Sequence, residues 1–200
     1  MGTIMGTKKA NLVQLRQSPL RQQYAKVPAD ATIFDSAHTL NACAGDEFHG
    51  SVVPSNNSGE ALPFGIHRAV GGDHDLPNPG DLLCSALAAC LDSSIRMLAA
   101  HFDLPLKSLQ VKVTAEVDVR GCLMVQRGVP VGFQRMHCIV LLTPSGDVDQ
   151  DQLQGLLTAA ENCCVVMQTL RNGVTVQAEL AAVEAVDSLE INAAVSDLSV

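Results

Sequence analysis

The fold is decided by residues 78–102, which read NPGDLLCSALAACLDSSIRMLAAHF. Asn78 is a common helix-capping residue, Pro79 suits the first helical turn, and Asp81 favours the positive end of a helix. Apolar residues then recur at spacings of three and four positions. Because they cover more than one side of the segment, we predict a helix of about twenty residues at the centre of the fold.

Stretches rich in β-branched and other apolar residues lie on both sides of this helix. The predicted strands are residues 31–40, 47–53, 64–70, 109–119, 133–143 and 174–180. Apolar and polar residues alternate within 109–119, which indicates one buried face, and 133–143 is predicted to pair with it in an antiparallel manner. Residues 148–170 are predicted to form two helices that meet near Glu161 and Asn162. Strands grouped around two helical blocks predict an α+β fold.

The length and composition predict one folded domain, which we place at residues 31–180. A chain of 200 residues with 47% hydrophobic and 17% charged residues can bury a substantial core. Residues 1–30 are predicted to be an N-terminal extension with a short helix around Pro19–Lys26. Residues 181–200 are rich in small and acidic residues and are predicted to be a C-terminal tail.

The net charge of −8 and the scarcity of aromatic residues argue against two classes of partner. Nucleic acid requires a basic face with stacking aromatic side chains, and an anionic membrane surface would repel an acidic chain. Asp92 and Arg96 interrupt the longest apolar stretch, residues 82–102, so we predict no membrane span. No apolar core of signal-peptide length follows the basic residues near the amino terminus, and we therefore expect a cytoplasmic protein.

The seven cysteines are the residues from which chemistry is expected. Reduced thiols in a cytoplasmic protein are structural, metal-binding or catalytic. Cys84 and Cys90 are six positions apart, about 240° around a helix, so they cannot share a face. A cysteine on an apolar helical stripe, such as Cys90, is usually a packing residue. The same interpretation is given to Cys43, Cys122 and Cys138.

Cys163 and Cys164 are adjacent, which allows three interpretations. They could form a vicinal disulfide, bind a soft metal together with a distant histidine, or combine one reactive thiol with one packing thiol. No CxxC or HxxxH spacing supports a metal site, so we expect no metal and no other cofactor. Neighbouring helical side chains point about 100° apart, which favours the third interpretation. The residues alone thus give two candidate thiols on two helices.

Two segments carry the pattern of a known protein family. Residues 78–90 read NPGDLLCSALAAC, and residues 160–170 read AENCCVVMQTL. They resemble the two cysteine motifs of the osmotically inducible protein C and organic hydroperoxide resistance family (OsmC/Ohr), the first at the start of its central helix. A leucine follows the second family cysteine by six positions, so Leu170 identifies Cys164 as that residue. The resemblance extends over about residues 31–180.

The resemblance implies an OsmC-like fold, in which antiparallel sheets surround a central helix in an intertwined homodimer with active sites at the subunit interface. It further implies a peroxiredoxin-like, thiol-dependent peroxidase of the stress response. Cys90 would attack an organic hydroperoxide and Cys164 would resolve the oxidised thiol as a disulfide. A dithiol reductant would then restore both thiols. Such chemistry requires two cysteines because a sulfenic acid must condense with a second thiol before it is overoxidised.

The family pairs its first cysteine with an arginine that a glutamate orients. Residues 64–68, FGIHR, resemble the segment that carries this arginine, which makes Arg68 the candidate, with a simple surface role as the alternative. Gly80 stands where the family has the glutamate, and Asp81 beside it could orient Arg68 or only charge the helix terminus. The second motif has Val165 where a proline is common. These differences indicate a divergent branch.

Two other functions are considered for the same chain. One is a non-peroxidatic OsmC-like protein that binds a small apolar or electrophilic ligand at the dimer interface. The other is a thiolate metal site formed by Cys163, Cys164 and a histidine. Loss of hydroperoxide consumption on Cys90→Ser substitution would favour the peroxidase over both.

Overall fold

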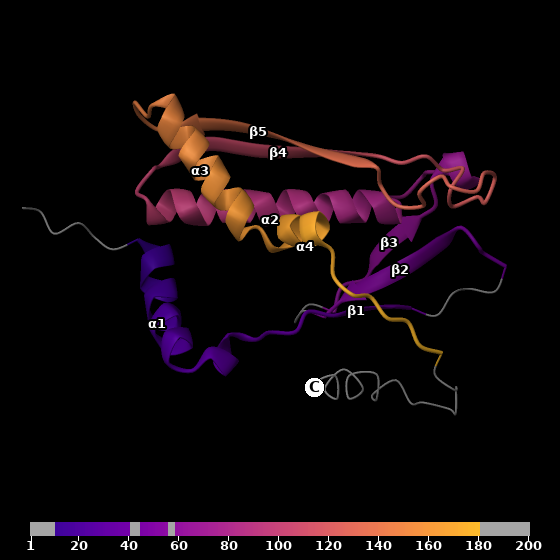
Figure 1. Cartoon of the computed structure of the whole chain (residues 1–200), viewed down its shortest axis with the longest axis horizontal. Helices are drawn as coiled ribbons and strands as arrows, with labels where there is room; N and C mark the ends of the chain where they lie inside the picture. The colour runs from indigo at the N-terminus through magenta and orange to yellow at the C-terminus, as the bar shows by residue number, and fades with distance from the viewer. Residues whose placement is uncertain (1–10, 41–44, 56–58, 181–200) are drawn as a thin grey trace, which may run out of the picture.

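The computed structural model describes residues 11–40, 45–55 and 59–180 (Figure 1). In chain order its elements are α1 (Leu12–Lys26), the 3-10 helix η1 (Pro28–Ala31), β1 (Ala37–Thr39), β2 (His49–Pro54), β3 (Leu62–Gly65), the 3-10 helix η2 (Arg68–Val70), α2 (Pro79–His101), β4 (Leu106–Glu116), β5 (Arg135–Pro144), α3 (Gln150–Cys163) and α4 (Val165–Asn172). The long helix α2 lies along the β4–β5 hairpin, and α3 and α4 also pack against it. This confirms the predicted α+β class with a central helix.

The amino terminus of α2 is capped as its sequence predicts. The Asn78 side-chain oxygen accepts from the Gly80 N–H at 2.8 Å and from the Asp81 N–H at 3.3 Å. The Asp81 carboxylate in turn accepts from the Asn78 N–H at 3.0 Å, which completes a capping box. The helix continues for 23 residues. Its length and apolar composition would suit a membrane span, but here it is the core helix between β4, α3 and α4.

One face of α2 forms the centre of the hydrophobic core. Leu87, Leu91 and Ile95 recur every four residues on that face, and all three are almost fully buried. From α3 and α4 the buried side chains of Leu156, Ala160, Cys164 and Met167 complete the cluster. The inward faces of β4 and β5 pack against it through alternate residues, as a half-buried antiparallel hairpin requires.

A second antiparallel sheet has the order β1-β2-β3 and lies near the amino terminus of α2 (Figure 1). Gly50 in β2 pairs with Phe64 in β3. A Cβ atom on Gly50 would lie 2.5 Å from the Phe64 ring, so the aromatic side chain fits over the strand only because a glycine is present.

Helix α1 is longer than the predicted helix at 19–26 and contains Pro19. It joins the carboxyl end of α2, where the Gln14 amide donates to the His101 carbonyl at 3.2 Å and the Asn11 amide donates to the Ala100 carbonyl. These contacts satisfy carbonyl groups that a helix end leaves without partners. The predicted strand at 31–40 was largely wrong, since only Ala37–Thr39 pairs with β2.

Two further strand predictions require correction. The predicted strand at 64–70 ends at Gly65, because the His67 Nδ1 atom accepts from the Ala69 N–H at 3.0 Å and starts the turn η2. The predicted strand at 174–180 is absent, and the side chains of Val174, Val176 and Leu180 are 64%, 83% and 101% exposed. A strand needs a neighbour, and this segment pairs with no other strand of the described chain.

His49 connects the β1-β2-β3 sheet to the loop before α2. Its Nδ1 atom lies 2.9 Å from Asp46 Oδ1, and its Nε2 atom lies 3.2 Å from Asp75 Oδ1. The hydrogen bond with Asp46 and then that with Asp75 raise the pKa of His49, and His49 lowers the pKa of both carboxyl groups. All three groups are therefore charged only at pH values above the lowered pKa values of the two carboxyl groups and below the raised pKa of His49.

We expect His49→Gln to lower the melting temperature more at about pH 6 than at about pH 9, because these pH values lie below and above a raised histidine pKa. A raised folded pKa contributes stability that is fully present below the unfolded pKa and is lost as pH rises through the folded one. Thermal unfolding followed by circular dichroism across this range checks the result. His137→Gln, at an exposed strand position, is the control. An equal loss at both pH values would contradict the charged state of His49.

Candidate functional site

Cys164 lies at the junction between α3 and α4 rather than inside one helix. Its backbone is extended, with φ −77° and ψ 102°, and it serves as C-cap of α3 and N-cap of α4. The Gln168 amide donates to the Glu161 carbonyl at 2.9 Å across the junction. The two predicted helices thus meet a few residues later than the predicted position near Glu161 and Asn162.

The break in the helix gives the adjacent cysteines different surroundings. Cys164 is completely buried, whereas Cys163 is exposed. Both are free thiols. Within residues 11–40, 45–55 and 59–180, no three histidine, cysteine or acidic side chains are grouped closely enough to hold a metal ion. The geometry therefore separates the two thiols and turns only Cys164 toward α2.

Cys90 and Cys164 are brought together in the core although they are far apart in the sequence. Cys90, on α2, is half-buried and packs against the cluster that contains Cys164. Burial is the largest of the causes that together raise the pKa of the Cys164 thiol to about 11; the Met167 backbone lowers it, and Cys90 raises it through a side-chain hydrogen bond and its charge. Cys164 is therefore a protonated thiol beside Cys90 at neutral pH.

Arg68 and Asp81 are not joined in the described chain. Arg68 is exposed on η2 and forms no side-chain hydrogen bond or ion pair with any described residue. The Asp81 carboxylate is instead bonded to Asn78 in the capping box of α2. Within the described chain, Asp81 therefore acts on the helix terminus and not on Arg68.

The position of Gly80 has a structural reason that the sequence did not reveal. A Cβ atom on Gly80 would lie 3.0 Å from the Phe133 ring, and 2.9 Å from the Asn78 side-chain oxygen. Phe133 belongs to the long β4–β5 connection and occupies the space beside the first turn of α2. A side chain at position 80 would require the Phe133 ring and the Asn78 side chain to shift, so Gly80 lets the ring lie close to the first turn of α2.

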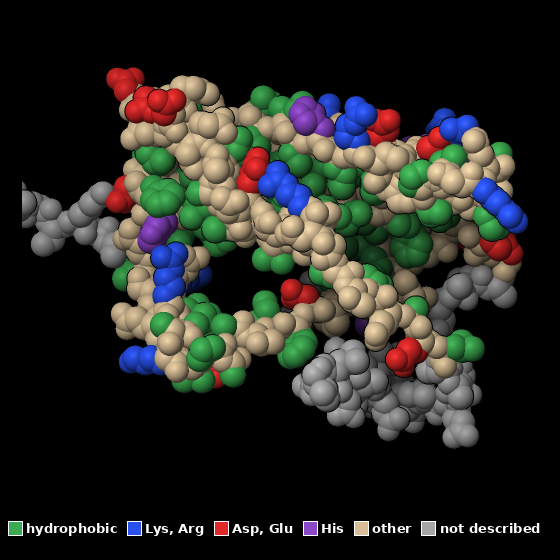
Figure 2. All heavy atoms as spheres, in the orientation of Figure 1, with side chains coloured by type: hydrophobic (Ala, Val, Ile, Leu, Met, Phe, Trp, Pro, Cys, Tyr) green, Lys and Arg blue, Asp and Glu red, His purple; other side chains and the backbone are tan. Residues whose placement is uncertain are grey.

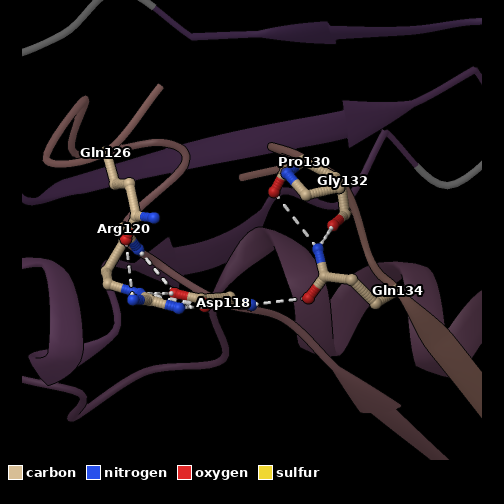
Figure 3. A network of polar contacts seen from close by, with 6 residues as sticks. All are labelled: Asp118, Arg120, Gln126, Pro130, Gly132 and Gln134. Carbon is tan, nitrogen blue, oxygen red and sulfur yellow. Dashed lines mark hydrogen bonds and ion pairs between the residues drawn. The ribbon is translucent and has the colours of Figure 1, made fainter. Parts of the chain in front are cut away.

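A polar network fixes the β4–β5 connection that carries Phe133 (Figure 3). The Arg120 Nε atom donates to both carboxylate oxygens of Asp118, at 2.9 and 3.0 Å, and its Nη1 atom donates to Gln126 at 2.9 Å. The Gln134 side chain accepts from the Asp118 N–H at 2.7 Å and donates to the carbonyl oxygens of Pro130 and Gly132. These bonds hold the two ends of the connection together without regular secondary structure.

This connection forms one wall of a groove of about 1690 Å³. The other walls are η2, the first turns of α2, the adjoining ends of β4 and β5, and α4. Apolar side chains gather in this hollow below the hairpin and beside α4 (Figure 2). Cys84, Cys122 and Cys138 line the groove, whereas Cys90 and Cys164 do not. An ion pair between Arg171 and Glu161, with atoms 3.0 Å apart, lies at its edge.

Sequence reasoning missed the position of Cys84 and Cys138 in this groove. Burial raises the pKa of both thiols. The charge of Asp81 also raises the pKa of Cys84, and the charge of Glu161 also raises the pKa of Cys138. The strand at 133–143 was predicted, but nothing in its sequence says which helix the Cys138 side chain meets. The helical positions of Cys84 and Cys90 correctly excluded a shared face, and the structure has them on different sides of α2.

Comparisons with known proteins bear on this site and on the fold. A protein-family model described as OsmC-like protein matches residues 72–179. A solved OsmC-like protein of unknown function from Vibrio cholerae is 12% identical, with a TM-score of 0.58 over 69% of this chain and 94% of that chain. No curated protein matches the chain.

Two similar structures are described as organic hydroperoxide resistance proteins. The one from Legionella pneumophila is 20% identical, with a TM-score of 0.51 over 74% of this chain and 96% of that chain. The one from Elizabethkingia anophelis is 18% identical, with a TM-score of 0.53 over 72% and 92% of the two chains. At these identities the likeness establishes the arrangement of helices and strands, and the chemistry must be argued from the residues of this chain.

Proposed function

Because this chain belongs to the OsmC-like family, we propose that it is a thiol-dependent peroxidase that reduces organic hydroperoxides with Cys90 and Cys164. The observation that carries the proposal is that Cys90 packs against the buried cluster that contains Cys164. Cys90 is the half-buried member of the pair and Cys164 the fully buried one. A hydroperoxide therefore reaches Cys90 first.

The proposed reaction proceeds in two steps within one subunit. The Cys90 thiolate attacks the terminal peroxide oxygen, the O–O bond breaks, and the departing alkoxide takes a proton to become an alcohol. Cys90 is then a sulfenic acid. The Cys164 sulfur attacks the Cys90 sulfur, and the hydroxyl group leaves with the Cys164 proton as water. A dithiol then reduces the disulfide by two thiol–disulfide exchanges and becomes oxidised itself.

The surroundings of Cys90 favour apolar hydroperoxides over hydrogen peroxide. Its helical neighbours Leu87 and Leu91 are buried apolar residues, and the thiol packs against the hydrophobic cluster. Transfer of an apolar substituent of the peroxide from water into such surroundings is favourable. The selectivity proposed here is therefore set by burial of the organic group and not by a charged contact.

The proposed active unit is a homodimer. Residues 174–180 follow α4 without regular secondary structure, and the side chains of Val174, Val176 and Leu180 are exposed. Alternate apolar residues of this kind are typical of a strand, and no strand within the described ranges pairs with them. Pairing of this segment with a second copy would bury these side chains. Size-exclusion chromatography with light scattering distinguishes a dimer from a monomer.

The test of the function is consumption of cumene hydroperoxide by the reduced protein with dithiothreitol as reductant. We expect turnover, and a second-order rate with cumene hydroperoxide about tenfold or more above that with hydrogen peroxide, because an apolar pocket discriminates by the organic group. A folded protein that consumes neither peroxide would contradict the proposal. Binding of an apolar ligand without turnover would instead support the non-peroxidatic function, for which the apolar groove is the observation in favour.

Arg68 is proposed to stabilise the Cys90 thiolate in the homodimer, since it has no competing partner among the described residues. We expect Arg68→Ala to lower the rate of Cys90 oxidation by about tenfold to a hundredfold, because a nearby cation favours the thiolate. Arg68→Lys keeps the charge and should retain most of the rate. Stopped-flow measurement of single-turnover oxidation checks both variants.

Asp81→Asn separates the two roles considered for this carboxylate. Because Asp81 is bonded within the capping box, the substitution should lower the melting temperature and leave the oxidation rate within about twofold of the wild type. A loss of rate as large as that of Arg68→Ala, in a stably folded Asp81→Asn protein, would show that Asp81 orients the arginine.

A further inference from the structure

Helix α1 has a large surface that no other described element covers. None of its residues is buried, and the side chains of Leu12 and Leu15 are 60% and 59% exposed. Asn11, Gln14 and Gln17, at its start, donate the hydrogen bonds that join it to α2. A helix of 15 residues is marginal in water unless one of its faces is packed. The free face of α1 is therefore a candidate surface for docking.

Every charged side chain of α1 is basic. These side chains are Arg16, Arg21 and Lys26, and all three are exposed. Figure 2 shows basic side chains over this helix. Within the described ranges, no acidic group forms an ion pair with any of the three. Although the net charge of the chain is −8, α1 thus offers a surface that is both apolar and positively charged.

The carboxyl-terminal tail, residues 181–200, lies outside the described residues, and its sequence carries the opposite charge. Its four charged residues are all acidic: Glu184, Asp187, Glu190 and Asp197. Val183, Val186 and Leu189 each directly precede one of the first three, so apolar and acidic residues recur together at every third position. The tail therefore complements α1 in charge and also has apolar side chains to place against its leucines.

The position of the tail in the chain allows it to reach α1. A segment of 20 residues spans up to about 66–72 Å when extended, which is about twice the 35 Å length of α2. In Figure 1, α1 and the segment that follows α4 both lie on the side of α2 opposite the β4–β5 hairpin. Both α1 and the tail lie outside the residues that match the family model, 72–179, so the shared fold assigns a partner to neither.

We propose that the carboxyl-terminal tail packs on α1 of the same chain. Its carboxylates would lie against Arg16, Arg21 and Lys26, and its apolar side chains against Leu12 and Leu15. Exposed ion pairs are individually weak and are screened by salt, so the apolar contacts supply the attraction and the charges set the orientation. This docking is independent of the proposed peroxidase chemistry.

The first test is zero-length cross-linking of the full chain with a water-soluble carbodiimide, which joins an amine directly to a neighbouring carboxylate. A link within one chain leaves the monomer mass on a denaturing gel, and peptide mapping of that band identifies the linked residues. We expect Lys26 to be joined to acidic residues of the tail. The exposed amines of Lys107 and Lys112, on β4, are the control and should give about tenfold fewer links to the tail, because docking raises the effective concentration only at α1.

The second test is hydrogen exchange of the full chain after the tail is neutralised without a change in size. The variant combines Glu184→Gln, Asp187→Asn, Glu190→Gln and Asp197→Asn. The amides of α1 should exchange about tenfold faster than in the wild type, because a helix that loses its cover opens more often, whereas those of α3 should be unchanged. Asp147→Asn, at an exposed position outside the tail, is the matched control and should leave α1 unchanged.

Two results would overturn the docking. One is equal exchange of α1 in the neutralised variant and the wild type. The other is the absence of links between Lys26 and the tail at the monomer mass. Links found only at twice that mass would assign the tail to a second copy of the chain and would contradict docking within one chain.

Discussion

Cys90→Ser is expected to lower the rate of organic hydroperoxide consumption by about a thousandfold or more, because a serine hydroxyl is not ionised at neutral pH and cannot replace a thiolate nucleophile. Serine has nearly the same volume as cysteine, so the half-buried position on α2 should remain folded. The measurement is loss of cumene hydroperoxide in the presence of dithiothreitol. A variant with more than a tenth of the wild-type rate would show that Cys90 is not the peroxidatic residue.

Cys164→Ser should have a different effect at the same site. The first oxidation of Cys90 should proceed at the wild-type rate, but the sulfenic acid then lacks the adjacent thiol that removes it. A second peroxide would convert it to sulfinic acid, which dithiothreitol does not reduce. Intact mass measurement should therefore show a single turnover followed by two added oxygen atoms. Cys163→Ser, at the exposed neighbouring position, should retain multiple turnover.

Leu91→Ala is expected to have the largest effect on stability, about 2–5 kcal/mol of the free energy of unfolding. Leu91 is 1% exposed at the centre of α2, where it contacts the side chains of α3 and α4 that hold Cys164. Truncation removes buried apolar surface and leaves a cavity that a packed core cannot close. Urea unfolding followed by circular dichroism measures the change.

Leu15→Ala is the matched control for this substitution, since Leu15 is also helical but is 59% exposed on α1. A change of at most about 0.5 kcal/mol is expected there. Equal losses in the two variants would show that α2 does not form the core described here.

The sequence was sufficient for those features that depend on local chemistry. The Asn78 cap was predicted because capping residues act within one turn, whereas the part that Asp81 has in the cap came from the structure. The β4–β5 hairpin was predicted because alternating apolar and polar residues, as in 109–119, are typical of a half-buried strand. The pairing of Cys90 with Cys164, in contrast, came only from the family resemblance, since periodicity can place each thiol on a helix face but cannot say which faces meet.

Features that depend on distant partners were missed for the same reason. Residues 174–180 have the composition of a strand, yet whether they form one depends on a neighbouring strand, and none of the described strands pairs with them. The contact of Phe133 with Gly80 joins a long connection to a helix start, and no spacing rule predicts it. Cys138 was assigned a packing role, and the structure adds that it also lines the groove.

The most direct test is peptide mapping of the reduced protein, quenched within the first turnover after one equivalent of cumene hydroperoxide. If Cys90 and Cys164 react as the proposed redox pair, the earliest new species is a peptide pair joined through Cys90 and Cys164. A first link between Cys163 and Cys164, or oxidised Cys90 beside a Cys164 that still reacts with alkylating agent, would contradict the redox role of this pair.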